Sequence, residues 1–478
     1  MAAVCGWAVL LIALLPGLLL QALDVRLSAA LALQCVVVAH AGGALARVLT
    51  ATKVRLVAFG FWLFAYVWLG LAPLTMLATD EYPLDYRAGA STAFTATVLI
   101  EVGFLAYSAG AFIAARHVKD QSVVVEAVLS RRLAPVRVLL LCGLVFVIAA
   151  VLIPQQGGPG IFFTSRQAVR EARGVSDSTH SVAQVMVAWS LAVPAFWALV
   201  ALVHLPRMNV GDRVLRAVRW MLLPLLLALN VVVNNPISKP RFWAGTVLLT
   251  LLFASSFLRR PRAFRVTAAA VLATLLLVFP YSDYFRYEER EAVNVVSIAE
   301  QFTTNSDYDA FQQMQTGIDY TKESGFSPST ALGPVLFMVP RSVWPDKPPD
   351  SGVHIAQFAG YDFHNLSAPL WIESYLWAGF PAVILVFCLL GAAGRRMDDI
   401  RSRLGHATLA ALLVPAFAMY QLVLLRGSLM GIVGPLFLLL TIPFFITTRG
   451  ARARRFSSAA VPAGTAGHAT ISGTGGHP

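Results

Sequence analysis

Charged residues are scarce in this chain of 478 residues: Asp, Glu, Lys and Arg make up 13% of it, whereas 57% is hydrophobic. An ordinary soluble domain carries about 25% charged residues. The mean hydropathy is +0.69. These values exclude a soluble globular protein, and they favour a polytopic membrane helix bundle.

Cysteine is equally scarce, and the sequence lacks the common cofactor motifs. The four cysteines, Cys5, Cys35, Cys142 and Cys388, lie in apolar segments without paired spacing or a neighbouring histidine. We interpret them as packing residues and not as metal ligands. The sequence also contains no P-loop, no Rossmann fingerprint and no internal repeat. We therefore expect neither a metal nor another cofactor.

Long apolar runs are abundant, and we read about twelve of them as membrane-spanning helices of roughly 20 residues each. The predicted spans are 4–23, 27–46, 56–78, 91–115, 138–153, 182–204, 220–233, 242–258, 266–280, 370–392, 407–425 and 429–447. The predicted fold class is all-α, with a single transmembrane domain over residues 1–454 that includes external loops 154–181 and 281–369. The composition of residues 455–478, rich in Ala, Gly, Ser and Thr, predicts a disordered cytoplasmic tail.

The net charge of +12 comes from 37 Lys and Arg against 25 Asp and Glu. If the N-terminus is cytoplasmic, most basic residues fall in the inner segments and most acidic residues in the outer ones. The positive-inside rule explains this distribution. We therefore expect a multi-pass membrane protein, with both termini in the cytoplasm and membrane lipids around it. Because this topology explains the net positive charge, the charge does not indicate a nucleic-acid partner.

The second outer loop, 281–369, is far longer than the usual connection of about 4 to 6 residues. Its many aromatic residues argue against disorder, and its pattern predicts helices over 288–302 and 307–323. We expect a large, partly helical external cap on the bundle.

Prolines at 340, 345, 348 and 349 stiffen one part of this loop and bar a regular helix there. Arg341 and Lys347 lie on this stiff segment, and cations with a preset geometry suit anion binding. Pairing of Arg341 with Asp346 or Asp350 is the alternative. Glu373 lies about one turn inside an apolar run, where a carboxylate is costly unless it faces a wet cavity or a cation.

Several short motifs recur in a fixed order along the chain. They are Gly157-Gly158 followed by Arg166, Arg170 and Arg173; Pro240-Arg241-Phe242; Arg341 with Gly352; Trp344-Pro345-Asp346-Lys347-Pro348; Glu373-Ser374-Tyr375 with Gly379-Phe380; and Arg426-Gly427-Ser428. In this order and topology the chain resembles the bacterial O-antigen and capsule repeat-unit polymerases of the Wzy type. It departs from their pattern in the first loop, where the spacing from Arg166 to Gly174 is shorter than the spacing from Arg341 to Gly352.

The resemblance implies a GT-C-like membrane glycosyltransferase that is inverting and metal-independent. Its substrate would be an oligosaccharide repeat unit on undecaprenyl diphosphate, and a flippase and a chain-length regulator are the expected partners. The catalytic candidates are Arg341 and a general base, either His364 or Glu373. The candidates for binding the diphosphate or sugar are Arg166, Arg170, Arg241, Lys347 and Arg426.

Each of these residues also has a structural interpretation. Arg241 and Arg426 lie at helix ends, where snorkelling arginines are ordinary. Arg166 and Arg170 share one helical face with Arg173, and nearby acidic residues can neutralise all three. We expect one of these three to contact substrate. Glu101, in the fourth helix, is expected to pair with a cation of the bundle.

Two other functions compete with the polymerase. An O-antigen ligase-type transferase differs in its acceptor, and His364-Asn365 resembles its histidine-asparagine motif. A flippase or other polysaccharide or lipid transporter has no need of a large ordered cap. The outer loop is therefore the feature that separates these functions.

The charge distribution makes a prediction about topology. A cysteine at Ser327 should react with a membrane-impermeant thiol reagent in intact cells, because the cap is outside, while a cysteine at Ser402 should not. Mass-tag labelling of the two variants measures this. Labelling at 402 and not at 327 would show that the orientation is inverted.

Overall fold

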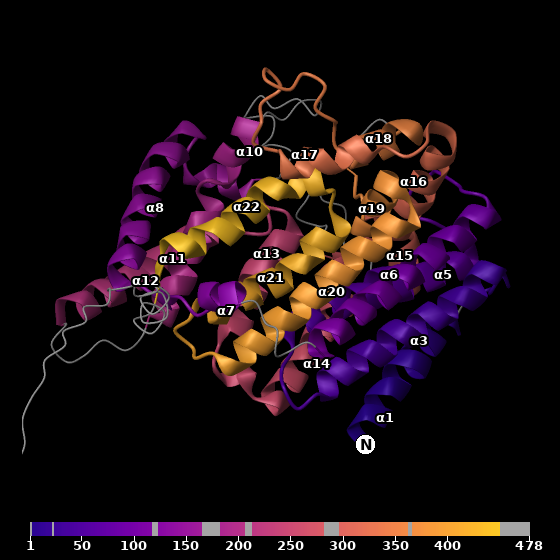
Figure 1. Cartoon of the computed structure of the whole chain (residues 1–478), viewed down its shortest axis with the longest axis horizontal. Helices are drawn as coiled ribbons and strands as arrows, with labels where there is room; N and C mark the ends of the chain where they lie inside the picture. The colour runs from indigo at the N-terminus through magenta and orange to yellow at the C-terminus, as the bar shows by residue number, and fades with distance from the viewer. Residues whose placement is uncertain are drawn as a thin grey trace, which may run out of the picture.

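The computed structural model describes residues 2–21, 23–116, 123–164, 182–205, 213–281, 296–361 and 366–449. This part of the chain is almost entirely helical (Figure 1). Strands β1 (Arg132–Leu133) and β2 (Thr447–Thr448) form a two-stranded antiparallel sheet, with Arg132 opposite Thr448. The predicted all-helical class is therefore confirmed.

The helices follow in chain order, with η marking π-helical or 3-10 turns. They are α1 (Ala2–Val9), η1 (Leu10–Leu14), α2 (Leu15–Leu20), α3 (Ala29–Thr50), α4 (Leu56–Phe64), η2 (Ala65–Leu71), α5 (Ala72–Thr79), α6 (Ala90–Arg116), α7 (Val123–Leu129), α8 (Pro135–Gln155), η4 (Pro159–Phe163), α10 (Val182–Trp189), α11 (Ala192–His204), α12 (Arg213–Val233), α13 (Arg241–Ala254), η5 (Phe257–Arg259), α14 (Pro261–Leu277), α15 (Ile298–Thr304), η7 (Ser306–Tyr308), α16 (Ala310–Ser324), η8 (Pro328–Ala331), α17 (Leu332–Val335), α18 (Ser351–Phe358), α19 (Leu370–Ala378), α20 (Phe380–Arg403), α21 (Leu409–Arg426) and α22 (Leu429–Phe445).

Among the described residues, 9 helical runs are long and apolar enough to cross a membrane. They are formed by α1 to α2, α3, α4 to α5, α6, α8, α10 to α11, α12, α20 and α21, and α13 and α22 are shorter apolar helices. A helix needs about 20 apolar residues to cross the hydrocarbon core. The chain is therefore a helical, multi-pass membrane protein.

The continuous run α4, η2 and α5 lies at the centre of the bundle, with nearly all of its side chains buried. It is hydrophobic all round, which is typical of a helix enclosed by others. Pro73 has no N–H to donate to the carbonyl of Leu69. Gln34 on α3 supplies the missing donor: its Nε2 lies 2.7 Å from the oxygen of Leu69 and 2.8 Å from that of Gly70. In hydrocarbon an unsatisfied carbonyl is costly, so Gln34 stabilises the helical run where Pro73 interrupts its hydrogen bonding.

Helices α6 and α20 lie side by side (Figure 1) and approach closely at glycines. A Cβ at Gly110 would clash with the carbonyl of Cys388, and a Cβ at Gly391 would clash with that of Tyr107. Small residues allow this close backbone contact between membrane helices.

Glu101 on α6 has the basic partner that the sequence predicts. His40 Nδ1 on α3 lies 2.7 Å from Glu101 Oε1, and the two side chains are 16% and 17% exposed. The partner is a histidine from a neighbouring helix, enclosed by the rings of Trp62 and Phe104.

The run 370–392, predicted as one span, is divided in the structure. Gly379 has φ 68, a conformation that favours glycine, and it separates α19 from α20. The ring centroids of Trp371 and Phe387 are 4.2 Å apart. A continuous helix would spread these two residues over about 24 Å, so the chain reverses at Gly379. Glu373 therefore lies on α19, a separate helix of 9 residues.

The cap consists of α15 to α18 with their connecting turns, gathered at one end of the bundle (Figure 1). Helix α16 agrees with the prediction for 307–323. Helix α15 covers the end of the predicted 288–302 helix, most of which lies outside the described residues. As the prolines predict, the segment from Val339 to Asp350 contains no helix.

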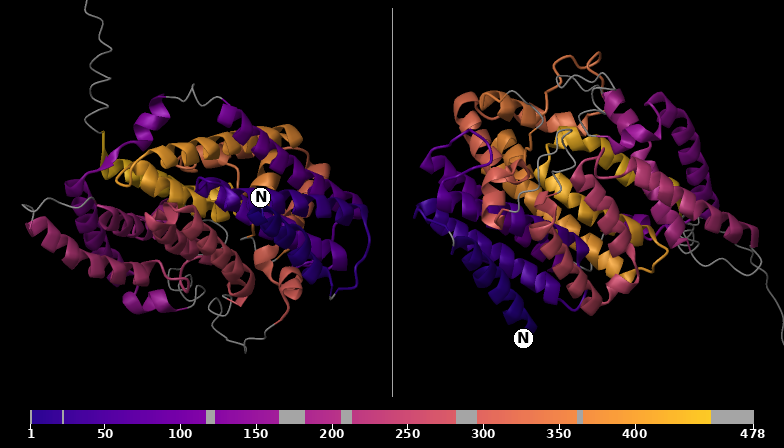
Figure 2. Two further views of the ribbon diagram at one scale, coloured as in Figure 1. Left: turned by 90° about the horizontal axis from the view of Figure 1, so that it is seen from below. Right: turned by 180° about the vertical axis from the view of Figure 1, so that it is seen from behind.

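Helices α8, α10, α11 and α12 form a lateral group on the opposite side of the bundle from α1 and α3, as Figure 1 and the rear view of Figure 2 both show. Two buried asparagines, one on the last turn of α12 and one directly after it, join this helix to its neighbours. Asn230 donates to Ala195 O at 3.0 Å, and Asn234 donates to Ala192 O at 3.0 Å while accepting from Trp243 at 2.8 Å. Such polar contacts between helices support packing where lipid provides no hydrophobic force.

Candidate functional site

Arg341 lies in the cap, on the loop between α17 and α18, and is exposed. Its Nη1 donates to the carbonyl of Lys347 at 2.7 Å. Within the described part of the chain it forms no ion pair, so the alternative pairing with Asp346 or Asp350 is not observed there. A guanidinium has five N–H donors, and most of those of Arg341 remain available to a ligand.

Lys347 is 3% exposed, and its ammonium points into its own loop. The Nζ donates to Phe337 O at 2.7 Å and to Val339 O at 3.0 Å. Burial, and then the charge of Arg341, lower the pKa of Lys347 below its usual value. Lys347 therefore fixes the loop that carries Arg341. For Lys347 itself to contact substrate, as the sequence predicts, its bonds to Phe337 and Val339 would have to break.

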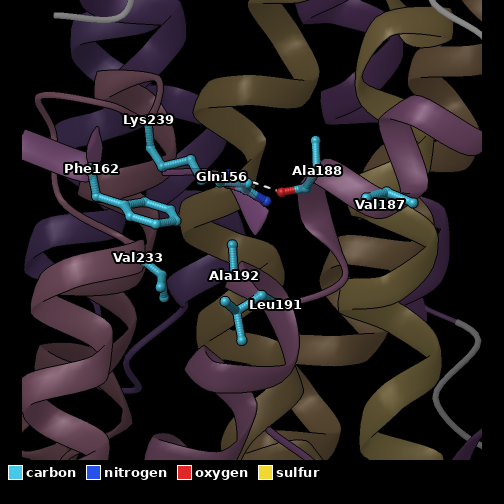
Figure 3. A pocket seen from close by; sticks show the side chains of 8 residues that line it. All are labelled: Gln156, Phe162, Val187, Ala188, Leu191, Ala192, Val233 and Lys239. Atoms are coloured by element: carbon cyan, nitrogen blue, oxygen red, sulfur yellow. Dashed lines mark hydrogen bonds between the residues drawn. The ribbon is translucent and has the colours of Figure 1, made fainter. Parts of the chain in front are cut away.

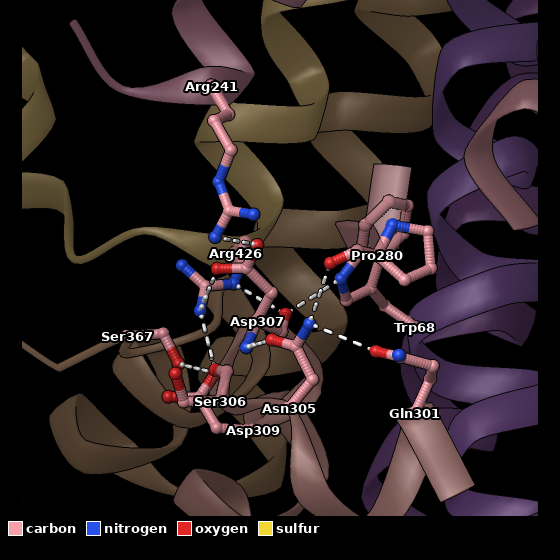
Figure 4. Close-up of polar contacts among 10 residues, drawn as sticks. All are labelled: Trp68, Arg241, Pro280, Gln301, Asn305, Ser306, Asp307, Asp309, Ser367 and Arg426. Atoms are coloured by element: carbon pink, nitrogen blue, oxygen red, sulfur yellow. Dashed lines mark hydrogen bonds and ion pairs between the residues drawn. The ribbon is translucent and has the colours of Figure 1, made fainter. Parts of the chain in front are cut away.

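Arg241 and Arg426 are far apart in the sequence but converge on one short cap segment, as Figure 4 shows. Arg241 Nη2, at the start of α13, lies 2.5 Å from Asp307 Oδ2. Arg426 Nη2, at the end of α21, lies 3.0 Å from Asp309 Oδ1 and 3.0 Å from Ser306 O, and its Nε donates to Asp307 O at 3.0 Å. Both guanidinium groups thus bind the segment that precedes α16.

The two aspartates are as enclosed as the arginines. Asp307 is 6% and Asp309 1% exposed. Ser367 Oγ donates to Asp309 Oδ1 at 2.7 Å, and Trp68 Nε1 of the central helix donates to Asp307 O at 3.0 Å. A buried ion pair is tolerated when further hydrogen bonds complete its partners. Arg241 and Arg426 do not snorkel in this structure; they join the cap to the bundle.

Glu373 belongs to a second polar cluster, at the start of α22. It is 1% exposed. Its Oε1 accepts from Ser351 Oγ at 2.7 Å, and its Oε2 accepts from the backbone N–H of Leu429 at 2.5 Å. The positive end of a helix dipole favours a carboxylate here. No cation pairs with Glu373 among the described residues, so the helix terminus and Ser351 take the place of the cation that the sequence suggested.

Asp350 faces the same turn of α22. It accepts from Gly352 N at 2.9 Å as the N-cap of α18, and a Cβ at Gly431 would lie 3.1 Å from its Oδ2. Burial raises the pKa of Asp350 above its usual range, although its hydrogen bonds act in the opposite direction. Asp350 and Glu373 are close enough for electrostatic repulsion. The structure therefore brings two carboxylates together at one helix terminus.

The two clusters are continuous through the turn between α21 and α22. Arg426 ends α21, and Leu429, which binds Glu373, begins α22. The Arg426-Gly427-Ser428 motif is thus the link between the ion pairs of the cap and the buried carboxylates.

Not all of the predicted residues can be placed. Arg166, Arg170 and His364 lie outside the described residues. The glycines before them are described: Gly157 and Gly158 have φ 96 and φ 90, which only glycine adopts readily.

Sequence reasoning missed Asp307, Asp309 and Asp350 as partners in the site. A signal existed for the first two, because an arginine enclosed at a helix end needs an acid, and Asp307 and Asp309 stand just before the amphipathic stretch that becomes α16.

Neither of two cavities formed by the described residues is lined by Arg341, Glu373, Arg241 or Arg426. One of about 10 Å³ lies beside Lys239, whose Nζ donates to Ala188 O at 3.0 Å (Figure 3). The other, of about 210 Å³, lies at the far end of the bundle. Within the described ranges no group of three or more His, Cys, Asp or Glu is placed to hold a metal ion.

Comparison of the chain with protein-family models, with curated proteins and with solved structures found no match. The chemistry of the site is therefore inferred from its residues and contacts.

The ion pair between Arg426 and Asp309 predicts strong energetic coupling. Arg426→Gln should destabilise the protein by about 3–5 kcal/mol, because it leaves a buried carboxylate unpaired. Asp309→Asn in the same chain should recover part of this loss. A double-mutant cycle on thermal unfolding in detergent measures the coupling.

The exposed pair Arg26–Asp80, 3.4 Å apart and 72% and 62% exposed, is the matched control. Its coupling should be below about 1 kcal/mol. Strictly additive losses at Arg426 and Asp309 would contradict their pairing.

Proposed function

We propose that this protein polymerises oligosaccharide repeat units carried on undecaprenyl diphosphate, as a Wzy-type glycosyltransferase at the outer face of the bacterial plasma membrane. The proposal includes about twelve membrane-spanning helices, a GT-C-like architecture and cytoplasmic termini. It is supported by the order of the sequence motifs and by the arrangement around Arg341.

The observation that carries the proposal is an exposed guanidinium on a stiff loop next to exposed apolar side chains. Prolines and the buried Lys347 hold the loop, and Arg341 has no carboxylate partner among the described residues. Apolar side chains flank it: Val335 is 74%, Met338 54% and Val343 73% exposed. A lipid-linked diphosphate requires this combination, a cation for its phosphates and an apolar surface for its chain.

The reaction needs a cation where charge develops. The acceptor hydroxyl attacks the anomeric carbon of the donor chain, so that a carbon–oxygen bond forms and the bond to the diphosphate oxygen breaks. The hydroxyl proton goes to a general base, and undecaprenyl diphosphate leaves with the electron pair. A guanidinium meets phosphate in bidentate geometry and stays protonated. Preorganised donors of this kind typically lower a barrier by about 3–4 kcal/mol.

The general base is proposed to be His364 or Glu373. Both oxygens of Glu373 are occupied, by Ser351 and Leu429. To act as a base, Glu373 would have to release one of these bonds when substrate binds. In the structure as it stands, Glu373 holds the α21–α22 turn against α18.

The reaction itself is the first test. Purified protein given lipid-linked repeat units should polymerise them in EDTA, because fixed guanidinium groups and not Mg²⁺ would neutralise the leaving diphosphate. Cells without the protein should keep the lipid-linked unit but contain no polymer longer than one repeat. Gel analysis of the glycans measures both.

Three outcomes would overturn this assignment. Loss of activity in EDTA with recovery in Mg²⁺ would exclude the arginine mechanism. Long polymer that persists in the deletion strain but is not attached to its final acceptor would favour the ligase. Polymer confined to the inner face would favour the transporter.

Arg341→Lys should impair polymerisation nearly as strongly as Arg341→Ala, because lysine keeps the charge but loses the planar fork. Rates with both variants, at matched membrane levels, measure this. Arg87→Lys is the control, since Arg87 is also exposed and donates to a backbone carbonyl, that of Tyr86, at 3.2 Å. Full activity in Arg341→Lys would rule out bidentate diphosphate binding at this residue.

A further inference from the structure

The larger cavity, of about 210 Å³, lies between α3, α4, α6 and α20 at the end of the bundle away from the cap. A liquid water occupies about 30 Å³, so the cavity accommodates more than a single solvent molecule. Its lining combines basic, hydroxyl and apolar side chains: Ala44, Arg47, Val48, Arg55, Ala58, Trp62, Tyr107, Ser108, Ala111, Arg395 and Asp398.

Three arginines from three helices or their ends face this cavity with most of their donors available. The side chain of Arg55 forms no hydrogen bond or ion pair with any described residue, and only its backbone carbonyl accepts from Phe59 N, at 3.0 Å. Arg47 uses its Nε on Gly43 O at 3.3 Å. Arg395 uses its Nε on Asp399 Oδ2 at 2.7 Å. The terminal guanidinium nitrogens of all three are thus left without a partner in the described part of the chain.

Asp398, the carboxylate in the lining, does not neutralise these arginines directly. Its Oδ1 accepts from Val57 N at 3.0 Å and its Oδ2 accepts from Ala58 N at 3.1 Å, so it caps the start of α4. Asp399 binds Arg395 but does not line the cavity. The cavity therefore retains a positive excess.

The lining of the cavity also contains two hydroxyl groups, those of Tyr107 and Ser108. Tyr107 is 2% exposed, and its ring is stacked on Phe61 with centroids 3.6 Å apart. Neither Tyr107 nor Ser108 donates a hydroxyl hydrogen bond to another described residue. Two hydroxyl donors in the lining are therefore available to the oxygens of an anion.

Apolar side chains on α6 adjoin this polar group. Leu105 and Phe112 are each 55% exposed. They stand three residues before and four residues after Ser108, which places them next to it on the helix surface. An anion that occupies the cavity would thus have an apolar surface beside it, as the acyl chains of a lipid require.

We infer that this cavity is a binding site for the phosphate headgroup of an anionic phospholipid, with Arg47, Arg55 and Arg395 as its ligands. Guanidinium groups bind phosphate oxygens in a fixed fork, and basic pockets between membrane helices hold lipid headgroups. Free phosphate shares the headgroup chemistry but makes no use of Leu105 and Phe112. The site is independent of the proposed reaction at the cap.

The test uses the full-length protein in nanodiscs of phosphatidylcholine, with and without phosphatidylglycerol. Phosphatidylglycerol should raise the unfolding temperature of the unmodified protein. For the Arg47→Gln and Arg55→Gln double variant, titration should show about a hundredfold weaker binding, because two charge-assisted contacts are lost.

Arg396→Gln is the control for the single Arg55→Gln change, since it also removes one guanidinium group at the end of the bundle away from the cap but does not line the cavity. This variant should bind phosphatidylglycerol as the unmodified protein does. Arg55→Gln alone should keep the fold, because Arg55 has no described partner, and should show a smaller loss.

Equal loss of phosphatidylglycerol binding in Arg396→Gln, or unchanged binding in the double variant and in Arg55→Gln, would overturn the proposal. Inorganic phosphate is added in a separate arm without anionic lipid. If it stabilised the protein as strongly as phosphatidylglycerol does, the lipid assignment would be wrong.

Discussion

The ion pairs of Arg241 and Arg426 with Asp307 and Asp309 are the interaction on which the position of the cap depends. They connect the start of α13 and the end of α21 to the cap segment between α15 and α16, and Trp68 of the central helix binds the same segment. Because all four charged side chains are enclosed, removing one leaves an unpaired charge in an apolar environment. The ion pairs therefore hold the cap on the bundle, because separating them would leave buried charges unpaired.

This arrangement divides the arginines at the cap end of the bundle into two kinds. Arg241 and Arg426 donate their hydrogen bonds to groups of the protein. Through the α21–α22 turn they also position the start of α22, which contacts Glu373 and Asp350. Arg341 remains exposed on a loop held by Lys347. A cation with available donors can stabilise developing charge without first breaking its own contacts, so Arg341 is the arginine best suited to a ligand.

The same requirement governs polar groups elsewhere in the bundle. Gln34 satisfies the carbonyls that Pro73 leaves free, Asp398 satisfies the first N–H groups of α4, and Glu101 meets His40. Hydrocarbon offers no water to replace these bonds. At the end away from the cap, the terminal guanidinium nitrogens of the lining arginines have no partner among the described residues, and this difference marks the cavity as a place for an external anion.

The sequence by itself determined the helical membrane class, the cap and the stiff loop around Arg341, because hydropathy, loop length and proline are local properties that survive into the fold. It did not determine the break at Gly379, since apolar residues continue on both sides of it. Nor did it show that Arg241 and Arg426 share Asp307 and Asp309, or that Glu373 rests on α22. Those pairings join residues far apart in the chain, and only the packing of helices decides which buried charge lies near which partner.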